Sequence, residues 1–454
     1  MKRHRSIKIY NTTRTITAAL VVTWTLNAST AFANDASIAS NVNGEPIVVA
    51  ASADRYAGAI DSVTFRGVEY INNYDHGRSL SVALQPDGLG ECYNPTEPGS
   101  YDDASSLTSS SILLSISNAG NVLTTQTNMV NWLRPGEASH TSCSGVNPPV
   151  GVNPTYLSNY ILSKTVSFYG SAIPNLFVDN VSISVPDTHN STNTEAATPY
   201  LPSQFTVFLN YDRISGTLTR LTASANDPAA GGISQALRTP VIVAVADGTS
   251  AMGMISSSTY DGSSNQPYYD YFRFPGPGGP NSKLSCVFGG GAVQPGSTLN
   301  YTCAFAVGSV DEVIAAMNAY PNQGSTQNIP VYRFYDGARH FFSKSYNEGS
   351  TTGYSFETTA FHLFQAGAGN GYYPLYRCYN VGAGDHFIST QSNCEGFSQE
   401  GIYGYAAPTA QPGLYPLYRF FRGGASADHL ETINYAEGAN NGYTYEGILG
   451  YVVS

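Results

Sequence analysis

Short runs of alternating apolar and polar residues fill the chain between Asn34 and Tyr320. A period of two places successive side chains on opposite faces of a β-strand. Gly, Pro, Asn and Ser separate the runs, as expected for turns. The pattern predicts an antiparallel β-sandwich over 34–320. The runs lie at 59–65, 68–71, 110–116, 164–168, 177–185 and 205–209.

One helix is predicted near the end of this region. Ser309 can cap it, Glu312 stands three residues later as in a capping box, and Val313–Met317 supplies an apolar stripe. The helix must stop before Pro321. Residues 321–328 are uncharged from Asn322 onward and rich in Gly, Ser and Asn, so they are predicted to form an interdomain linker.

Residues 329–454 repeat one pattern three times. The openings at 330–335, 374–379 and 416–421 share Pro, an aliphatic residue, Tyr and Arg, with a His about ten residues later. Each unit closes on Gly, an aromatic residue, a hydroxyl residue, any residue and Glu, at 353–357, 396–400 and 442–446. Internal repeats of this period indicate one supersecondary unit used repeatedly. We predict a C-terminal β-trefoil, with an open three-unit array as the alternative.

The N-terminus has the features of an export signal. Five cationic residues precede an apolar stretch at Ile16–Leu26, and Ala31-Phe32-Ala33 fits a cleavage site. A membrane anchor is the alternative, but the apolar stretch is shorter than the roughly 18 residues that span a bilayer. We therefore predict a signal peptide at 1–33, and a secreted, periplasmic or cell-surface protein.

Charge restricts the classes of partner. The net charge of the full chain is −11, and it becomes −16 after removal of 1–33, which holds five cationic and no acidic residues. Such a chain repels phosphate backbones and anionic lipid. Nucleic acid and membrane surfaces are therefore poor partner candidates, and we predict no nucleic-acid partner. No membrane span is expected after processing, and a neutral ligand is favoured.

The cysteines support the same compartment. An even number of cysteines in an exported chain predicts disulfides. Neighbouring pairs Cys286/Cys303 and Cys378/Cys394 would close short loops of similar length, each worth roughly 3 kcal/mol in the chain-entropy model. This leaves Cys92 and Cys143, whose pairing the sequence does not decide. A metal site is disfavoured because no C-x-x-C spacing occurs.

The C-terminal motifs resemble a family of tandem repeats of unknown function. It is found at the ends of exported bacterial and fungal proteins, often beside hydrolases, and is thought to fold as a β-trefoil. The resemblance rests on the three Pro-x-Tyr-Arg openings, Asp385-His386-Phe387, 393–396 and the closing 446–451. It implies a Cys378–Cys394 pair. The first copy departs, with Arg339 in place of Asp and Phe361-His362 in place of Gly-Tyr.

The N-terminal region is similar to exported galactose-mutarotase-like supersandwich domains, through Gly58-Ala59-Ile60 leading to Tyr74-Asp75-His76-Gly77-Arg78. That type includes aldose epimerases and sugar-recognising domains of polysaccharide-degrading enzymes. Its epimerases use a His acid and a Glu base, but neither motif matches this chain residue by residue.

Two constellations could bind sugars. In the repeats, a carboxylate, an imidazole and a tyrosine ring suit sugar hydroxyls and the apolar face of a sugar. The alternative, which we favour, is a polar network that ties each repeat together, with Arg333, Arg377 and Arg419 and the closing glutamates as structural residues. The candidate ligand residues are Tyr376, Asp385, His386, Tyr418, Asp428 and His429.

In the first domain, His76, Glu91, Glu97, Arg134 and Trp132 could line a sugar pocket, with His76 as acid and Glu91 or Glu97 as base. We favour a structural alternative to this pocket, in which 74–78 form a turn at the end of a strand and 90–97 form a loop held by a disulfide at Cys92. No serine-hydrolase elbow, zinc-protease, Walker or dinucleotide motif occurs, so no metal or cofactor is expected.

The leading hypothesis is an exported, non-catalytic protein that binds a neutral glycan or cell-surface polymer. The alternatives are an epimerase or lyase-like enzyme using His76, Glu91 and Arg134, and a structural envelope protein.

Overall fold

The computed structural model describes eight segments of the chain, with the backbone alone for His76 and Phe274. The predicted signal peptide at 1–33 and residues 321–327 of the predicted linker lie outside them. The segments are 35–103, 108–141, 143–221, 237–256, 267–274, 280–320, 328–369 and 371–454.

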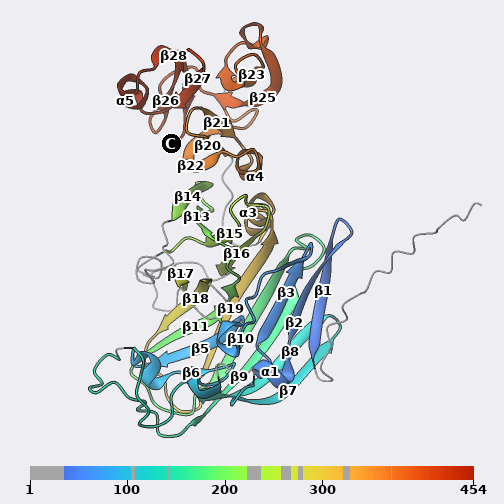
Figure 1. The fold of residues 1–454 in the computed structure, drawn as a ribbon, viewed down its shortest axis with the longest axis vertical. Coiled ribbons are helices and arrows are strands. Elements are labelled where there is room, and N and C mark those ends of the chain that lie inside the picture. The colour runs from blue at the N-terminus through green and yellow to red at the C-terminus, as the bar shows by residue number, and fades with distance from the viewer. Residues whose placement is uncertain are drawn as a thin grey trace, which may run out of the picture.

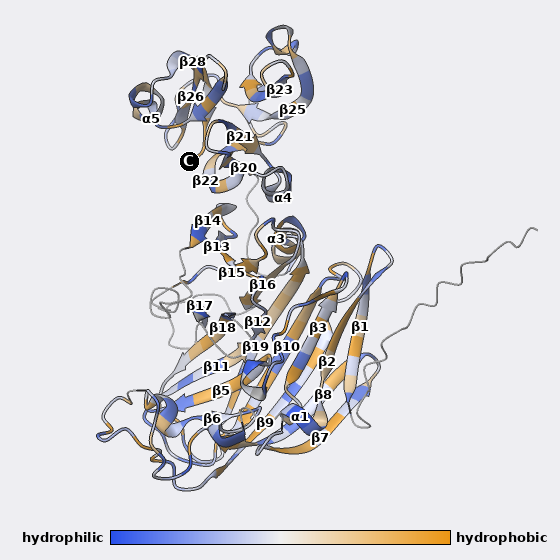
Figure 2. Ribbon diagram, viewed as in Figure 1, coloured by the Kyte–Doolittle hydropathy of each residue, from blue (hydrophilic) through white to orange (hydrophobic). Residues whose placement is uncertain are grey.

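The regular structure of the described chain is mostly antiparallel β-strand, which confirms the predicted all-β class. The molecule is elongated, with the β-sandwich at one end of the long axis and the repeats at the other (Figure 1). Apolar residues are interspersed with polar ones along the strands of the sandwich, as Figure 2 shows, and the apolar side of each strand supplies the core.

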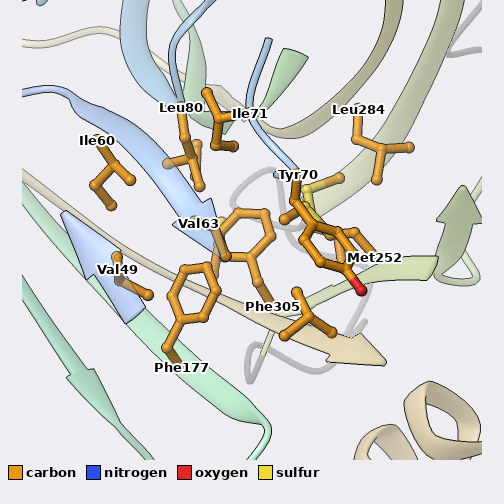
Figure 3. Packing of buried hydrophobic residues seen from close by; sticks show 14 of the residues in the cluster. Val49, Ile60, Val63, Tyr70, Ile71, Leu80, Phe177, Met252, Leu284 and Phe305 are labelled. Atoms are coloured by element: carbon orange, nitrogen blue, oxygen red, sulfur yellow. The ribbon is translucent and has the colours of Figure 1, made fainter. Parts of the chain in front are cut away.

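The N-terminal sheet covers one part of a much larger sheet. Its strands pair in the order β1-β2-β3-β4. They are β1 (Ala36–Val42), β2 (Glu45–Ala51), β3 (Ile60–Phe65) and β4 (Val68–Glu69). Val49 and Val63 of this sheet pack close to Phe177 and Phe305 of the large sheet (Figure 3). Burial of these apolar faces holds the two sheets together.

The large sheet runs β12-β18-β11-β5-β6-β8-β9-β10-β19-β16-β15-β13-β14, with β17 on β18 and β7 on β8. Its strands are β5 (Ser81–Pro86), β6 (Pro95–Thr96), β7 (Ile112–Ala119), β8 (Val122–Asn131), β9 (Leu157–Phe168), β10 (Leu176–Ser184), β11 (Thr192–Thr198), β12 (Tyr200–Leu201), β13 (Val207–Asp212), β14 (Thr217–Leu221), β15 (Val241–Ala244), β16 (Ala251–Ser256), β17 (Pro267–Phe274), β18 (Asn281–Gly290) and β19 (Thr298–Gly308).

Helices are short and few in the described part. The predicted helix is α3, and its capping box forms, with Ser309 and Glu312 bonding each other's backbone N–H groups. The sandwich holds α1 (Ala53–Tyr56), α3 (Val310–Ala319) and the 3-10 turns η1 (His76–Arg78), η2 (Gly90–Tyr93) and η3 (Tyr101–Asp103). The disulfides are Cys92–Cys143, Cys286–Cys303 and Cys378–Cys394.

Each repeat is a three-stranded antiparallel unit with one helical turn. Unit 1 comprises β20 (Asn328–Tyr335), β21 (His340–Ser343), α4 (Tyr346–Thr351) and β22 (Ser355–Phe364). Unit 2 comprises β23 (Tyr373–Asn380), β24 (Asp385–Ser389), η4 (Cys394–Gly396) and β25 (Ser398–Ala406). Unit 3 comprises β26 (Tyr415–Arg422), β27 (Asp428–Thr432), α5 (Tyr435–Asn440) and β28 (Thr444–Val452).

The last strands of the three units meet in pairs. Phe364 of β22 pairs with Tyr405 of β25, and isolated bridges join His362 to Val453 and Ala407 to Tyr451. Each unit therefore contacts both of the others, which makes a ring. The hydrogen-bonded sheets are one of six strands and one of three, and neither closes into a barrel. The predicted trefoil is therefore not confirmed, because a trefoil needs a closed barrel of strands.

Unit 1 is docked on the β-sandwich domain. A single hydrophobic cluster joins Val313 and Met317 of α3 to Tyr332, Tyr346 and Phe356 of unit 1. Polar contacts flank this cluster. The carboxylate of Asp311 accepts hydrogen bonds from the backbone N–H groups at the start of α4, at 2.8 Å from Tyr346 and 3.2 Å from Asn347. Burial of this kind fixes unit 1 against the sandwich.

Candidate functional site

A hollow of about 230 Å³ lies on the face of the large sheet formed by β5, β6, β11 and β18. Residues directly opposite each other on paired strands point to the same face. Glu195 is opposite Ala83, and Ala83 is opposite Thr96, so these three side chains form a row across three strands. Tyr200 is opposite Lys283 in the same way. The strand register thus brings together residues that are distant in sequence.

The opposite rim of the hollow is a loop stapled by a disulfide. Cys92–Cys143 fixes η2, which presents Glu91. Trp132 follows β8, and its backbone N–H donates to the Asn94 carbonyl at 2.8 Å. The ring of Tyr101 packs edge-on against the indole at 5.7 Å, which orients Trp132. The lining residues are Gly77, Ser81, Val82, Ala83, Gln85, Glu91, Asn94, Thr96, Pro98, Trp132, Glu195, Thr198, Tyr200 and Lys283.

Two charges in the hollow neutralise each other. The Lys283 ammonium lies 2.8 Å from Glu195, and the Thr198 hydroxyl donates to the same carboxylate at 3.1 Å. Burial favours the neutral amine, but the charge and hydrogen bond of Glu195, together with the nearby Tyr200 and Asp270, outweigh it, so the pKa of Lys283 is raised. Lys283 therefore stays cationic at neutral pH and acts as a hydrogen-bond donor rather than as a base.

Glu91 is the other carboxylate of the hollow. It is half-buried, and Ser139 Oγ donates to Glu91 Oε2 at 3.1 Å. Its carboxylate can accept further hydrogen bonds, because an ionised carboxylate has about four lone-pair sites. The hollow therefore offers carboxylate, amide and hydroxyl groups, one ammonium group and an indole ring within one concave surface.

The structure brings together two of the predicted residues of this domain, Glu91 and Trp132. Gly77 lines the same hollow, which places the backbone of the adjacent His76 next to it, although the His76 side chain lies outside the description. Arg134 lies outside the lining. It is exposed, forms an ion pair with Asp102 and stacks 4.1 Å above the ring of Tyr156.

Sequence reasoning missed Glu195, Tyr200 and Lys283. They come from β11, β12 and β18, which neighbour β5 only through strand pairings across long sequence separations. No local sequence pattern shows which strands pair across such separations, so the sequence does not reveal that these residues share one face. Glu97, in contrast, is buried behind the sheet and forms no part of the hollow.

In the repeats, arginine and glutamate residues link neighbouring units. Arg419 Nε bonds Glu446 of its own unit at 2.7 Å, and its Nη1 bonds Glu395 of unit 2 at 2.6 Å. The equivalent bonds repeat around the ring at similar distances. They join Arg333 to Glu357 and to Glu437 of unit 3, and Arg377 to Glu400 and to Glu348 of unit 1.

The aspartate and histidine residues make a second set of links between units. The carboxylate of Asp385 in unit 2 contacts His429 Nδ1 of unit 3 at 2.6 Å, and Asp428 of unit 3 contacts His340 Nδ1 of unit 1 at 2.9 Å. The third link is absent because unit 1 carries Arg339, which instead donates to the carbonyls of Ala383 and Gly384. Asp385 and Asp428 are fully buried in these contacts.

The pKa values of two histidines differ in direction, in line with the absence of the third Asp–His link. Burial lowers the pKa of His429, but the hydrogen bond to Asp385 and the negative charges of Asp385, Glu431 and Glu446 together outweigh it, so the pKa is raised overall. Burial lowers the pKa of His386, whose ring stacks on Tyr379 at 4.2 Å. The predicted ligand residues Asp385, Asp428 and His429 thus lie within the network that joins the units.

Unit 3 carries an exposed aromatic surface, which we call the tyrosine surface. It consists of Tyr418, Tyr435 and Tyr445, whose ring centroids lie 5.2–6.2 Å apart. Tyr435 and Tyr445 are 46% and 42% exposed. Of the predicted ligand residues, Tyr418 belongs to this surface, and Tyr376 is half-buried beside the Cys378–Cys394 disulfide.

Neither a metal centre nor a spanning helix is found in the segments that the structure describes. No group of three or more His, Cys, Asp or Glu side chains there could hold a metal ion. No described helix has both the length and the apolarity needed to cross a bilayer.

Comparison with known proteins finds a family match in the C-terminal region alone. A family model described as a domain of unknown function (DUF5648) matches residues 310–395 and 330–453. No curated protein matches the chain.

The solved structures that resemble this chain do so only distantly. They include heparan sulfate lyase HepC from Pedobacter heparinus (9% identity, TM-score 0.31, 61% of this chain and 35% of that one). They also include the alpha-galactosidase from Lactobacillus brevis (8%, TM-score 0.33, 60% and 39%) and a putative aldose 1-epimerase from Klebsiella pneumoniae (6%, TM-score 0.24, 62% and 85%). The chain spans little more than a third of the lyase, and TM-scores this low carry no argument about function.

Proposed function

We propose that this protein is an exported, non-catalytic binding protein for an uncharged glycan, and that the glycan binds in the hollow bounded by β5, β6, β11, β18 and Trp132. The observation that carries the proposal is the meeting of an oriented indole with carboxylate, amide and ammonium groups in one concave site. An aromatic ring stacks on the apolar face of a sugar, and the polar groups match its hydroxyls.

The size and charge of the hollow narrow the ligand. Its volume of about 230 Å³ is below the roughly 300–1,000 Å³ of sites for drug-sized ligands, so it suits one sugar residue of a longer chain. Lys283 is neutralised by Glu195, and Glu91 adds a negative charge. A sulfated or carboxylated sugar would be repelled by Glu91 and by the net negative charge of the chain.

Export is supported by the cysteines. All six form disulfides, and disulfides persist in oxidising compartments, which supports a location outside a reducing cytoplasm.

The tests use the mature full-length chain on an array of neutral and acidic glycans. Trp132 is the only tryptophan outside residues 1–33, so its fluorescence reports directly on occupancy of the hollow. We expect a neutral glycan to shift this emission, and Trp132→Phe or Glu91→Gln to weaken binding by about tenfold or more. Tyr445→Ala, at the far end of the molecule, serves as the matched control. Binding unaffected by either change in the hollow contradicts the proposal.

An enzyme acting on carbohydrate is the second candidate, because Glu91 and the residue after His76 line the same hollow. In this case, His76 and Glu91 would supply the acid and the base. Turnover of a glycan that His76→Ala abolishes, with binding retained, would replace the binding role with a catalytic one.

The predicted glycan site in the repeats remains a prediction. The tyrosine surface supports it, because exposed rings can stack on sugars. The use of Asp385, Asp428 and His429 in links between units favours a structural role for those three residues.

A further inference from the structure

Three ionisable side chains are buried near one another in the core, on the other side of the large sheet from the hollow. Lys164 projects from β9, Asp179 from β10, and Glu97 follows directly after β6. All three are at most 1% exposed. The Lys164 ammonium lies 2.7 Å from the Glu97 carboxylate, and the Val82 backbone N–H donates to the same carboxylate at 3.0 Å. Burying three ionisable groups in an apolar interior costs free energy unless they are paired and hydrogen-bonded.

Asp179 is held beside Lys164 by the strand register. In the β9–β10 pairing, Asp179 is opposite Val166 and Lys164 is opposite Val181, so the two are diagonal neighbours on one face. Diagonal neighbours are about 7–8 Å apart at their Cα atoms, a distance that the four-carbon stem of a lysine can cover. Within the described residues, neither carboxyl oxygen of Asp179 has a hydrogen-bond partner.

The surroundings favour the neutral acid at Asp179. Burial raises its pKa to about 7, since the opposing effect of the Lys164 charge is partly cancelled by that of Glu97. Burial also raises the pKa of Glu97. A protonated carboxyl group can be attacked by an amine, and a carboxylate in contact with an ammonium group can accept its proton.

We propose that Lys164 and Asp179 condense to an intramolecular isopeptide bond, with Glu97 as the proton acceptor. Glu97 takes one proton from the Lys164 ammonium, and the amine lone pair forms a bond to Cγ of Asp179. The Cγ–OH bond then breaks, and the hydroxyl leaves as water with a second proton from the same nitrogen. The products are a secondary amide, one water molecule and a protonated Glu97, so atoms and charge balance without an added reagent.

The product relieves the electrostatic cost of the cluster. An ammonium, a carboxylate and a carboxylic acid become a neutral amide and a neutral acid, which can hydrogen-bond each other in the core. The new bond would join β9 to β10. Because Cys303 is opposite Asp179 on β19 and is bonded to Cys286 on β18, the amide and the disulfide would lie side by side as two covalent links.

The test is the intact mass of the folded, mature full-length chain after reduction of its disulfides. We expect a mass lower than that of the sequence by one water molecule, with the loss mapping to a branched tryptic product that contains Lys164 and Asp179. A mass equal to that of the unlinked chain, or a water loss that maps elsewhere, overturns the proposal. This measurement on the wild type does not depend on any variant folding.

Variants then assign the roles. Lys164→Arg and Asp179→Ala remove one reacting group each, and both should show the full unlinked mass. Glu97→Gln keeps the shape of the side chain but removes the proton acceptor, and it should also show the full mass. If Glu97→Gln still loses water at Lys164 and Asp179, the role given to Glu97 is wrong. Trp132→Phe, in the hollow, should keep the bond, so the test is independent of glycan binding.

Discussion

Units 1 and 3 of the repeats share a pattern but use the same surface differently. In unit 1, the aromatic surface of Tyr332, Tyr346 and Phe356 is buried against α3. In unit 3, the equivalent tyrosine surface is open to solvent. The repeated sequence thus places the same aromatic surface on both units. The part of the fold that lies next to each unit decides whether this surface is buried in the core or open to a partner.

A further difference lies at the middle of the last strand. Thr359 of unit 1 exchanges hydrogen bonds with the backbone of Leu218, at 2.9 and 3.0 Å. The matching residues, Ile402 of unit 2 and Ile448 of unit 3, are 52% and 43% exposed. Apolar residues are thus exposed in the two units that do not dock, and such patches mark interaction sites more often than isolated exposed residues do.

The largest expected effect comes from the matched pair Tyr346→Ala and Tyr435→Ala. Tyr346 is 2% exposed and fills the interface with α3, so its removal leaves a cavity and should cost about 3–5 kcal/mol of unfolding free energy. Tyr435 is 46% exposed and packs against neighbouring rings of its own unit, so its removal should cost about 1 kcal/mol. Denaturant unfolding of both variants measures the difference. Equal costs would mean that the tyrosine surface is already covered by something in solution.

A smaller effect is expected from Arg419→Ala compared with Arg333→Ala. Arg419 holds unit 3 to unit 2, and loss of its charged hydrogen bonds should cost about 2–3 kcal/mol. Arg333 makes equivalent bonds, but unit 1 is also held by the sandwich. Amide hydrogen exchange should therefore accelerate across β26–β28 in Arg419→Ala, and much less across β20–β22 in Arg333→Ala. The same loss of protection in both would show that docking adds nothing to unit 1.

The smallest effect is a difference in pH dependence between His429 and His386. The pKa of His429 is raised in the folded state, so its contribution is fully present below the unfolded value near 6.5 and is lost as pH rises through the folded value. The pKa of His386 is lowered, so protonation of the unfolded state costs stability as pH falls through about 6.5.

The measurement is the unfolding free energy of His429→Gln and His386→Gln at pH 5 and pH 8. His429→Gln should lose more stability at pH 5 than at pH 8, whereas His386→Gln should lose less at pH 5 than at pH 8. If the loss of unfolding free energy changed with pH in the same way for both variants, the absence of an Asp partner for His386 would have no effect on its pKa.

Local chemistry was readable from the sequence. Ser309 and Glu312 predicted the cap of α3, and the spacing of Cys286 and Cys303 predicted a bond. Each of these rests on residues close in sequence or on a residue type with few roles.

What the sequence did not reveal depends on long-range register. Lys283 and Glu195 meet because β18 pairs with β11, and no local pattern states that pairing. The network of Asp, His, Arg and Glu was expected to tie each repeat together internally, but it largely joins one repeat to the next. The repeated motif shows which residues belong to such a network. Only the arrangement of the units in space shows which residues pair with each other.

The arginine–glutamate ion pairs that join the three units in a ring restrict how the number of units can change. Every unit supplies a carboxylate to one neighbour and an arginine to the other, so deletion of a single copy leaves unpaired charges at both cut faces. An extra copy would carry both partners for its neighbours, but a ring that closes after three units has no free end at which to add it. A linear array can gain or lose one copy at its end, whereas a ring of three units is complete only with all three.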